Sequence, residues 1–323
     1  MIYGKIVAME ERVGSTNIKD ISAGGLIDRV AEAFNVQAEI DGDCVVLTGD
    51  DNLDLTRASS SVSAMAELSK SGDVDSRLTD YIIYLAKTNG LREFLRVGDE
   101  VIYTTPSGRP IKAKTLGQRF YTDALTRNEL VICSGPAGSG KTFLGVAMAV
   151  KAFRNKEVSR IILTRPAVEA GERLGFLPGD IEEKVNPYMR PIYDALSVLL
   201  GQEMFDRYYE KGLIEVSPLA FMRGRNLDDA FVLLDEAQNT TAEQMKMFLT
   251  RLGLNCRACV CGDFTQIDLP RGMTSGLYDC MKILERVEGV SIVSLKNADI
   301  VRNPLVQRIV AAYDAAEEGE RKI

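Results

Sequence analysis

The chain has 323 residues, a length that suits two domains, and its 46% apolar and 26% charged residues are typical of a globular protein. The absence of histidine excludes a histidine general base, a Ser-His-Asp triad and a histidine-ligated metal, so proton transfer must use carboxylates, Lys, Tyr, Cys or water. The net charge of −7 argues against non-specific nucleic-acid binding. The excess acidity lies mainly in residues 1–113, which hold 12 basic and 18 acidic side chains, whereas residues 114–323 hold 27 basic and 28 acidic ones.

Residues 1–75 predict a small α+β domain. Apolar residues at helical spacing favour a helix over 25–34, and the segments on either side of the turn Asp41-Gly42-Asp43 favour strands at 38–40 and 44–48. A second helix is expected over 52–70, before a Ser-Gly-Asp break.

Residues 76–113 predict a connector made of a helix and a hairpin. The helix is expected over 78–89, with Gly90 as its C-terminal stop. Strands at 101–103 and 110–112 flank a Pro-Ser-Gly turn and predict the hairpin.

Residues 114–323 alternate between short apolar strands and helices, which predicts an α/β domain with a parallel sheet and helices on both faces. An apolar helix is expected over 143–153. The expected strands are 130–133, 160–164, 231–235, 258–261 and 290–293.

A complete Walker A loop lies between the first of these strands and the helix. It consists of Gly135, Pro136, Ala137, Gly138, Ser139, Gly140, Lys141 and Thr142, with Phe143 directly after it. Glycines let backbone N–H groups wrap phosphates, and the helix N-terminus adds a favourable dipole. We expect Lys141 to reach the β- and γ-phosphates of ATP and Thr142 to bind Mg²⁺.

A Walker B pattern follows at the end of the strand 231–235. Four apolar residues lead to Asp235, predicted to hold Mg²⁺ through water, and Glu236, predicted to orient or deprotonate the attacking water. The sequence Asp-Glu-Ala-Gln has the form of a helicase DEAQ box. Gln266, after the strand 258–261, is expected to sense the γ-phosphate.

Several long segments together resemble the PhoH-like ATPases, bacterial P-loop proteins related to superfamily 1 helicases. The resemblance covers about 115–314 and implies a RecA- or helicase-like P-loop fold that hydrolyses ATP and binds or remodels RNA. Residues 1–75 also resemble the small KH-like region of the shorter members. The segments are 135–142, 164–172, 174–180, 235–241 and 266–272.

The resemblance implies further roles for single residues. Gln118 corresponds to a glutamine that reads adenine, and Thr164 and Arg165 correspond to a segment that contacts the nucleic-acid backbone. Arg302 is a candidate arginine finger or phosphate sensor, although the next residue is Asn303 where members of the family usually have histidine. Superfamily 1 helicases close their site with an arginine from a second motor domain. A chain with one such domain is therefore expected to form a homo-oligomer, such as a hexameric ring.

Other readings of the sequence remain open. The chain is also consistent with a nucleotide-gated interaction protein, or with a small-molecule kinase, although no arginine-rich lid is evident and Glu236 favours water as the acceptor. Three thiols, Cys256, Cys259 and Cys261, cluster without histidine, and two lie on an expected strand, so we assign them to the core rather than to a zinc site.

The sequence also predicts where the protein resides. No run of 18 apolar residues occurs, and the N-terminus lacks a signal-peptide core and cleavage site. The six cysteines are sparse, which favours reduced thiols over a disulfide framework. We therefore expect a cytoplasmic protein with no membrane partner.

Overall fold

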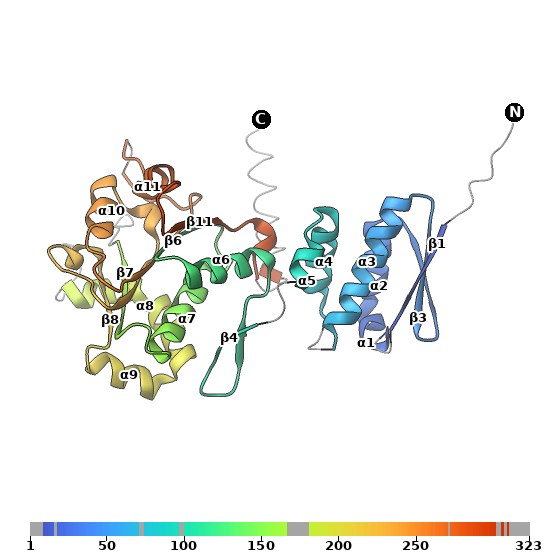
Figure 1. Cartoon of the computed structure of the whole chain (residues 1–323), viewed down its shortest axis with the longest axis horizontal. Helices are drawn as coiled ribbons and strands as arrows, with labels where there is room; N and C mark the ends of the chain where they lie inside the picture. Colours follow the sequence, from blue (N-terminus) through green and yellow to red (C-terminus); the bar gives the residue numbers. More distant parts are fainter. Residues whose placement is uncertain are drawn as a thin grey trace, which may run out of the picture. The chain divides into compact units, whose positions relative to one another are not determined.

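The computed structural model describes residues 9–15, 18–70, 74–96, 100–166, 181–270, 272–301, 305–306 and 309, with the backbone alone at 23 and 181–188. The described residues form two compact units, one within Met1–Gly98 and Asn303–Ile323 and one within Asp99–Arg302 (Figure 1).

The first unit packs helices against a three-stranded antiparallel sheet with the order β1-β3-β2. In the central strand, Val45 and Leu47 are fully buried while their neighbours are partly exposed, so one face of the sheet meets the helices. The strands are β1 (Met9–Gly14), β2 (Gln37–Asp41) and β3 (Cys44–Gly49). The helices are α1 (Ile18–Ser22), α2 (Leu26–Ala33), α3 (Asn52–Leu68), α4 (Ser76–Lys87) and α5 (Leu91–Arg96).

Local capping explains where the two longest of these helices begin. The Asp51 carboxylate accepts hydrogen bonds from the backbone N–H groups of Leu53 and Asp54, and Asp75 does the same at the start of α4. The helices and the two strands predicted for this unit are present, as α2, α3, α4, β2 and β3. Strand β1 was missed, because its sequence Met-Glu-Glu-Arg-Val-Gly buries only Val13.

The second unit begins with a hairpin and continues as alternating strands and helices. Its strands are β4 (Val101–Thr104), β5 (Pro110–Lys112), β6 (Leu130–Ser134), β7 (Arg160–Arg165), β8 (Ile214–Pro218), β9 (Ala230–Leu234), β10 (Arg257–Gly262) and β11 (Val290–Ser294). Its helices are α6 (Leu116–Arg127), α7 (Lys141–Arg154), α8 (Ile181–Leu200), α9 (Gln202–Glu210), α10 (Ala242–Leu249) and α11 (Gly276–Leu284).

Six of these strands form one parallel sheet with the order β11-β6-β10-β9-β7-β8. Successive residues of β9 illustrate its two faces: Leu233 packs with the core under α7, α8 and α9, while Val232 and Leu234 pack with α10 and α11. Helices cover both faces (Figure 1). The predicted α/β P-loop NTPase fold is thus confirmed, including all five predicted strands of the sheet.

The sheet brings three strand ends together. Strand β10 pairs with β6 on one side and with β9 on the other, and Gly262 lies opposite Ser134 in the register. The loops that follow β6, β9 and β10 therefore leave the same edge of the sheet side by side. Ligands bind at this carboxyl edge in open α/β sheets.

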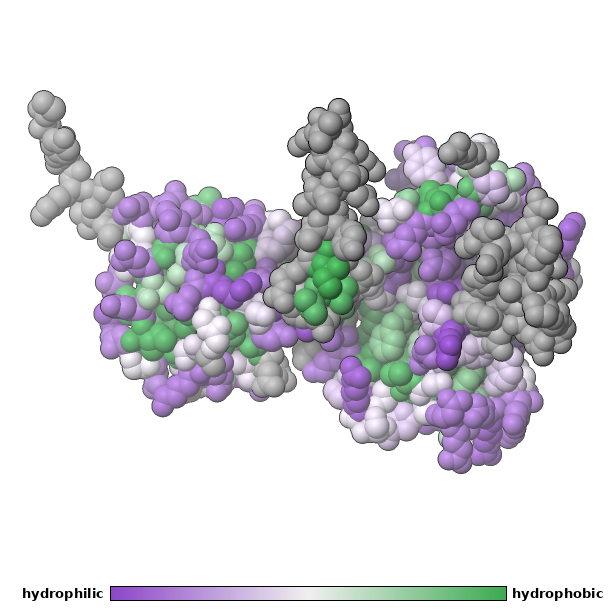
Figure 2. Space-filling model, turned by 180° about the vertical axis from the view of Figure 1, so that it is seen from behind, coloured by the Kyte–Doolittle hydropathy of each residue, from purple (hydrophilic) through white to green (hydrophobic). Residues whose placement is uncertain are grey.

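Hydrophilic side chains are spread over both units on the face drawn in Figure 2, with apolar side chains in smaller patches between them. Among the residues the structure describes, no helix combines the length and apolar composition needed to cross a membrane.

Gly276 supplies a test of how tightly α11 is docked beside the carboxyl edge. Its N–H donates to the carbonyl oxygen of Thr240 at 2.7 Å, and an added Cβ would lie 2.4 Å from the carbonyl oxygen of Thr241. Since the obstacle is backbone, we expect Gly276→Ala to destabilise the protein by about 1–3 kcal/mol and to lower its melting temperature in calorimetry. Gly14→Ala is the control, because its Cβ would meet only Cys44 Sγ at 3.4 Å. Equal melting temperatures for the two variants would contradict this packing.

Candidate active site

The loop between β6 and α7 has a backbone that only glycine adopts easily at two positions. Gly138 and Gly140 have φ of 83° and 88°, in the left-handed region. Gly135 is constrained by crowding instead, since an added Cβ would lie 2.7 Å from Leu295 Cβ. These three glycines explain why the loop can turn from the strand into the helix so closely against its surroundings.

The carbonyl groups of this loop are held by donors from other segments. The Gly138 oxygen accepts the backbone N–H of Val301 at 3.1 Å, and the Ser139 oxygen accepts Gln118 Nε2 at 3.0 Å. The first N–H groups of α7 have no acceptor within the helix. With the carbonyls engaged elsewhere, the loop and the helix N-terminus present N–H groups and a positive dipole end, which suit a phosphate.

Lys141 carries a buried positive charge inside the loop. Its side chain is 9% exposed, and Nζ donates to the carbonyl oxygens of Gly135 at 2.7 Å and Pro136 at 3.0 Å. Among the described residues, no carboxylate forms an ion pair with it. A buried charge with neutral partners alone is costly, so the site fits an anionic ligand such as a polyphosphate.

Thr142 and Asp235 join α7 to the end of β9. Thr142 Oγ1 donates to Asp235 Oδ1 at 2.7 Å, and Asp235 is only 2% exposed. The hydroxyl oxygen of Thr142 keeps its lone pairs, and Oδ1 keeps one acceptor position. Hydroxyl and carboxylate oxygens are the ligands that Mg²⁺ prefers, directly or through water, so these residues fit a magnesium ion bound with the nucleotide.

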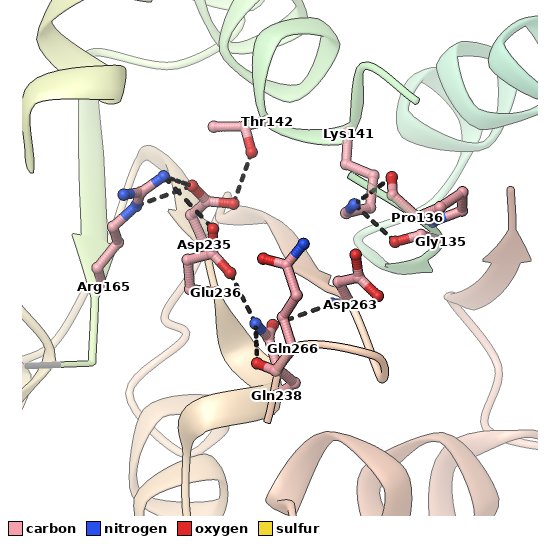
Figure 3. Close-up of polar contacts among 10 residues, drawn as sticks. All are labelled: Gly135, Pro136, Lys141, Thr142, Arg165, Asp235, Glu236, Gln238, Asp263 and Gln266. Carbon is pink, nitrogen blue, oxygen red and sulfur yellow. Dashed lines mark hydrogen bonds and ion pairs between the residues drawn. The ribbon is translucent and has the colours of Figure 1, made fainter. Parts of the chain in front are cut away.

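Arg165 holds the other oxygen of the same carboxylate. Its Nε donates to Asp235 Oδ2 at 2.9 Å, Nη2 contacts the same oxygen, and Nη2 lies 3.9 Å from Glu236 Oε1 (Figure 3). The Arg165 side chain is 13% exposed. The guanidinium therefore lies against both acids and fixes the rotation of Asp235.

Glu236 is the more open of the two acids. Its backbone is left-handed, with φ of 54°, and its side chain is 40% exposed. Oε2 accepts Gln238 Nε2 at 2.7 Å, and Gln238 also bonds to the loop that carries Gln266 (Figure 3). The two acids thus have distinct surroundings. Asp235 is buried and accepts hydrogen bonds at both carboxylate oxygens, whereas Glu236 is partly exposed and faces the site.

Comparison with known proteins gives this site a family. The sequence profile described as "PhoH-like protein" matches residues 110–314. The chain belongs to the PhoH-like protein family. The predicted resemblance is therefore confirmed, and the chain is a PhoH-like P-loop ATPase.

Three PhoH-like relatives show how far the similarity extends. A PhoH-like protein of Bacillus subtilis (strain 168) is 50% identical over 273 residues, which are 84% of this chain and 86% of that protein. A PhoH-like protein of Mycobacterium tuberculosis (strain ATCC 25618 / H37Rv) is 57% identical over 65% of this chain and 60% of its own length. Protein PhoH of Escherichia coli (strain K12) is 50% identical over 63% and 58%. The aligned part is thus less than two thirds of the last two relatives.

Among solved structures, the Sulfolobus solfataricus SWI2/SNF2 ATPase core in complex with dsDNA has a TM-score of 0.31 and 13% identity over 54% of this chain and 42% of that chain. That likeness is too low to support an inference.

Gln118 lies beneath the phosphate loop of this PhoH-like chain. It is 4% exposed; Nε2 donates to the carbonyl oxygens of Ser139 and Asp299, and Oε1 accepts the N–H of Lys114. Thr115 Oγ1 donates to the Asp299 carboxylate at 2.6 Å. The start of α6 and the segment near Asp299 are thereby fastened to the loop. An adenine contact through Gln118 stays a prediction.

Other predicted site residues have varied surroundings. Phe143 is half-buried against the core under α7, and Gln266 is exposed with its side chain toward the site (Figure 3). Thr164 is fully buried, and its Oγ1 has no hydrogen-bond partner among the described residues. Arg302 lies outside the described residues, so its role as a finger stays a prediction, as does a nucleic-acid contact at Thr164 and Arg165.

A buried tyrosine and two thiols lie between the sheet and the start of α7. Tyr121 Oη donates to the Lys141 carbonyl oxygen at 3.1 Å and lies 2.9 Å from Cys259 Sγ and 3.2 Å from Cys261 Sγ. Burial raises the pKa of Tyr121 and of Cys133 well above their usual values. Tyr121 and Cys133 therefore stay protonated. Cys259 and Cys261 are fully buried, which agrees with their expected place in the core.

Several side-chain contacts of the site were not predicted from the sequence. The contacts of Gln238 with Glu236, of Asp299 with Thr115 and of Arg165 with Asp235 were all missed. Gln238 had a signal, since it is the last residue of the Asp-Glu-Ala-Gln sequence.

We expect Lys141→Ala to lower ATP turnover by orders of magnitude while the fold persists, because it removes the buried charge that meets the phosphates. Turnover is measured by phosphate release, and folding by circular dichroism. Lys151→Ala is the matched control: it lies in the same helix, but its ammonium pairs with Glu100 at 3.7 Å. Near-normal turnover of Lys141→Ala would refute the assignment of the phosphate loop.

Proposed function

We propose that this protein binds ATP with Mg²⁺, hydrolyses it, and couples hydrolysis to the binding or remodelling of RNA. The observation that carries the proposal of hydrolysis is the pair of acids after β9. Asp235 is buried and bonded to Thr142, whereas Glu236 is partly exposed and directed by Gln238. Asp235 is placed to bind a metal ion, and Glu236 is accessible to water.

The proposed reaction assigns one task to each residue. The loop N–H groups and Lys141 would hold the β- and γ-phosphates, and Thr142 and Asp235 would hold the magnesium ion, Asp235 through water. Magnesium, when bound, neutralises charge on the phosphates. Glu236 orients the attacking water and accepts its proton as the oxygen bonds to the γ-phosphorus and the bond to ADP breaks. Gln266 contacts the γ-phosphate.

A small-molecule kinase is the weaker alternative. A kinase must bring an acceptor hydroxyl to the γ-phosphate, whereas the position of Glu236 suits the activation of water. A nucleotide-gated interaction protein with little turnover would use the same loop and is distinguished by its rate.

Glu236→Gln separates binding from chemistry. The variant keeps the size of the side chain but loses the base, so we expect ATP affinity with Mg²⁺ to persist and turnover to nearly stop. Calorimetry gives the affinity, and phosphate release gives the turnover. Loss of binding with Mg²⁺ present would instead make Glu236 a structural residue or a metal ligand.

The proposed coupling to RNA rests on the resemblance of the sequence segments to PhoH-like ATPases related to superfamily 1 helicases, and the near-neutral charge of residues 114–323 is compatible with it. We expect turnover to rise when single-stranded RNA is added, and RNA affinity to fall as salt increases, because phosphate contacts release counterions. Phosphate release is measured with RNA, with DNA of the same sequence and without nucleic acid. Turnover that no RNA changes, in a protein that does not bind RNA, would favour the interaction protein; phosphate transfer to a metabolite would favour the kinase.

Further parts of the proposal concern assembly and place. A homo-oligomer, such as a hexameric ring, would let Arg302 of one subunit reach the site of the next. Residues 1–75 would act as a KH-like docking or RNA-binding domain, joined by 76–113 to the ATPase domain at 114–323. We propose a cytoplasmic location.

A further inference from the structure

Gln238 is a fully buried amide in the turn directly after the Walker B acids. It lies in the short 3-10 helix Ala237–Asn239 and is 0% exposed. A buried amide is stable only when its donors and acceptor are satisfied. The partners of this side chain therefore show what the position is built to do.

Each hydrogen-bonding direction of the amide meets a group of the site (Figure 3). Nε2 donates to Glu236 Oε2 at 2.7 Å and to the carbonyl oxygen of Gln266 at 3.0 Å. Oε1 accepts the backbone N–H of Asp263 at 3.0 Å. Two of these partners accept only and the third donates only, so the orientation of the amide is fixed by chemistry.

Glu236 needs such a partner more than most acids do. Its left-handed backbone takes it out of the strand, and its half-open side chain has several rotamers available. The bond from Gln238 fixes Oε2, and the Arg165 guanidinium stands 3.9 Å from Oε1. The carboxylate is thus held from two sides while it still faces the site.

We propose that Gln238 is a positioning residue for hydrolysis, one that holds the Glu236 carboxylate and the Gln266 backbone in a single geometry. A shift of about 1 Å in a reacting group costs up to about 100-fold in rate. Gln238 acts through Glu236, so its loss lowers kcat and leaves the phosphate loop unchanged. This inference rests on the proposed hydrolysis of ATP.

The neighbouring residue offers a matched control. Asn239 is 7% exposed, belongs to the same turn and holds the same loop, since its Oδ1 accepts the N–H of Asp268 at 2.7 Å. Its side chain forms no recorded hydrogen bond with Glu236; the backbone N–H of Asn239 donates to the Glu236 carbonyl oxygen at 3.0 Å, and a side-chain substitution keeps that donor. Substitution of Asn239 therefore tests only the attachment of the loop that carries Gln266 and Asp268. Substitution of Gln238 tests that attachment together with the orientation of the Glu236 carboxylate.

The experiment compares Gln238→Met, Gln238→Glu and Asn239→Leu by kcat, KM and melting temperature. We expect both Gln238 variants to lose about 10- to 100-fold in kcat with KM within about twofold. Gln238→Glu keeps an oxygen for the Asp263 N–H but sets a carboxylate oxygen against Glu236, so it remains informative if Gln238→Met fails to fold. Asn239→Leu is expected to lower the melting temperature and to keep kcat.

A double substitution tests whether Gln238 acts through the acid. In single-turnover measurements, adding Gln238→Met to Glu236→Gln is expected to cause no further loss, because the base is already gone. Full additivity, an unchanged kcat in folded Gln238 variants, or an equal kcat loss in Asn239→Leu would each overturn the inference. Absence of hydrolysis in the unaltered protein would instead overturn the proposed function.

Discussion

The hydrogen bond between Thr142 and Asp235 joins two segments that lie 93 positions apart in the chain, and the rest of the site depends on it. It forms only because β10 separates β6 from β9 with a fixed register on both sides. A slip of one residue in either pairing would turn the strand end to the other face of the sheet. The buried cores on both faces prevent that slip, so the packing of the sheet keeps the phosphate loop and the acids at contact distance.

The parts of this architecture that follow local rules could be predicted from the sequence. The loop from Gly135 to Thr142 is recognisable in the sequence, because phosphate binding requires glycines and a lysine at fixed positions before a helix. Fully buried strands such as β6 and β9 appear as uninterrupted apolar runs. Strands β1 and β8 were not predicted. Strand β1 has three consecutive charged residues and only one buried valine, and the short Ile-Glu-Val-Ser-Pro run of β8 was not recognised as a strand. These two strands form because they pair with β3 and β7, respectively, and not because of a local sequence pattern.

The side-chain network around the acids could not be read from the sequence. The bond from Arg165 to Asp235 spans 70 positions, and the bond from Thr115 to Asp299 spans 184. No local pattern encodes such pairs, since they arise where the fold brings distant segments together. Arg165 shows the difficulty well: resemblance suggests a nucleic-acid contact, whereas its guanidinium lies mostly buried against a carboxylate. Both statements concern the same residue, but only the three-dimensional structure reveals the second.

The lysine of the phosphate loop has a consequence for how a ligand enters. Because loop carbonyls already replace the hydration shell around Lys141 Nζ, an arriving phosphate need not strip water from that ammonium. At Lys141 Nζ, a phosphate oxygen replaces the neutral carbonyl oxygens of Gly135 and Pro136, and only the Lys141 side chain has to move. The dehydration penalty is met when the chain folds rather than at each encounter. The hydrogen bonds of Lys141 thus arrange the loop around this nitrogen before a phosphate arrives.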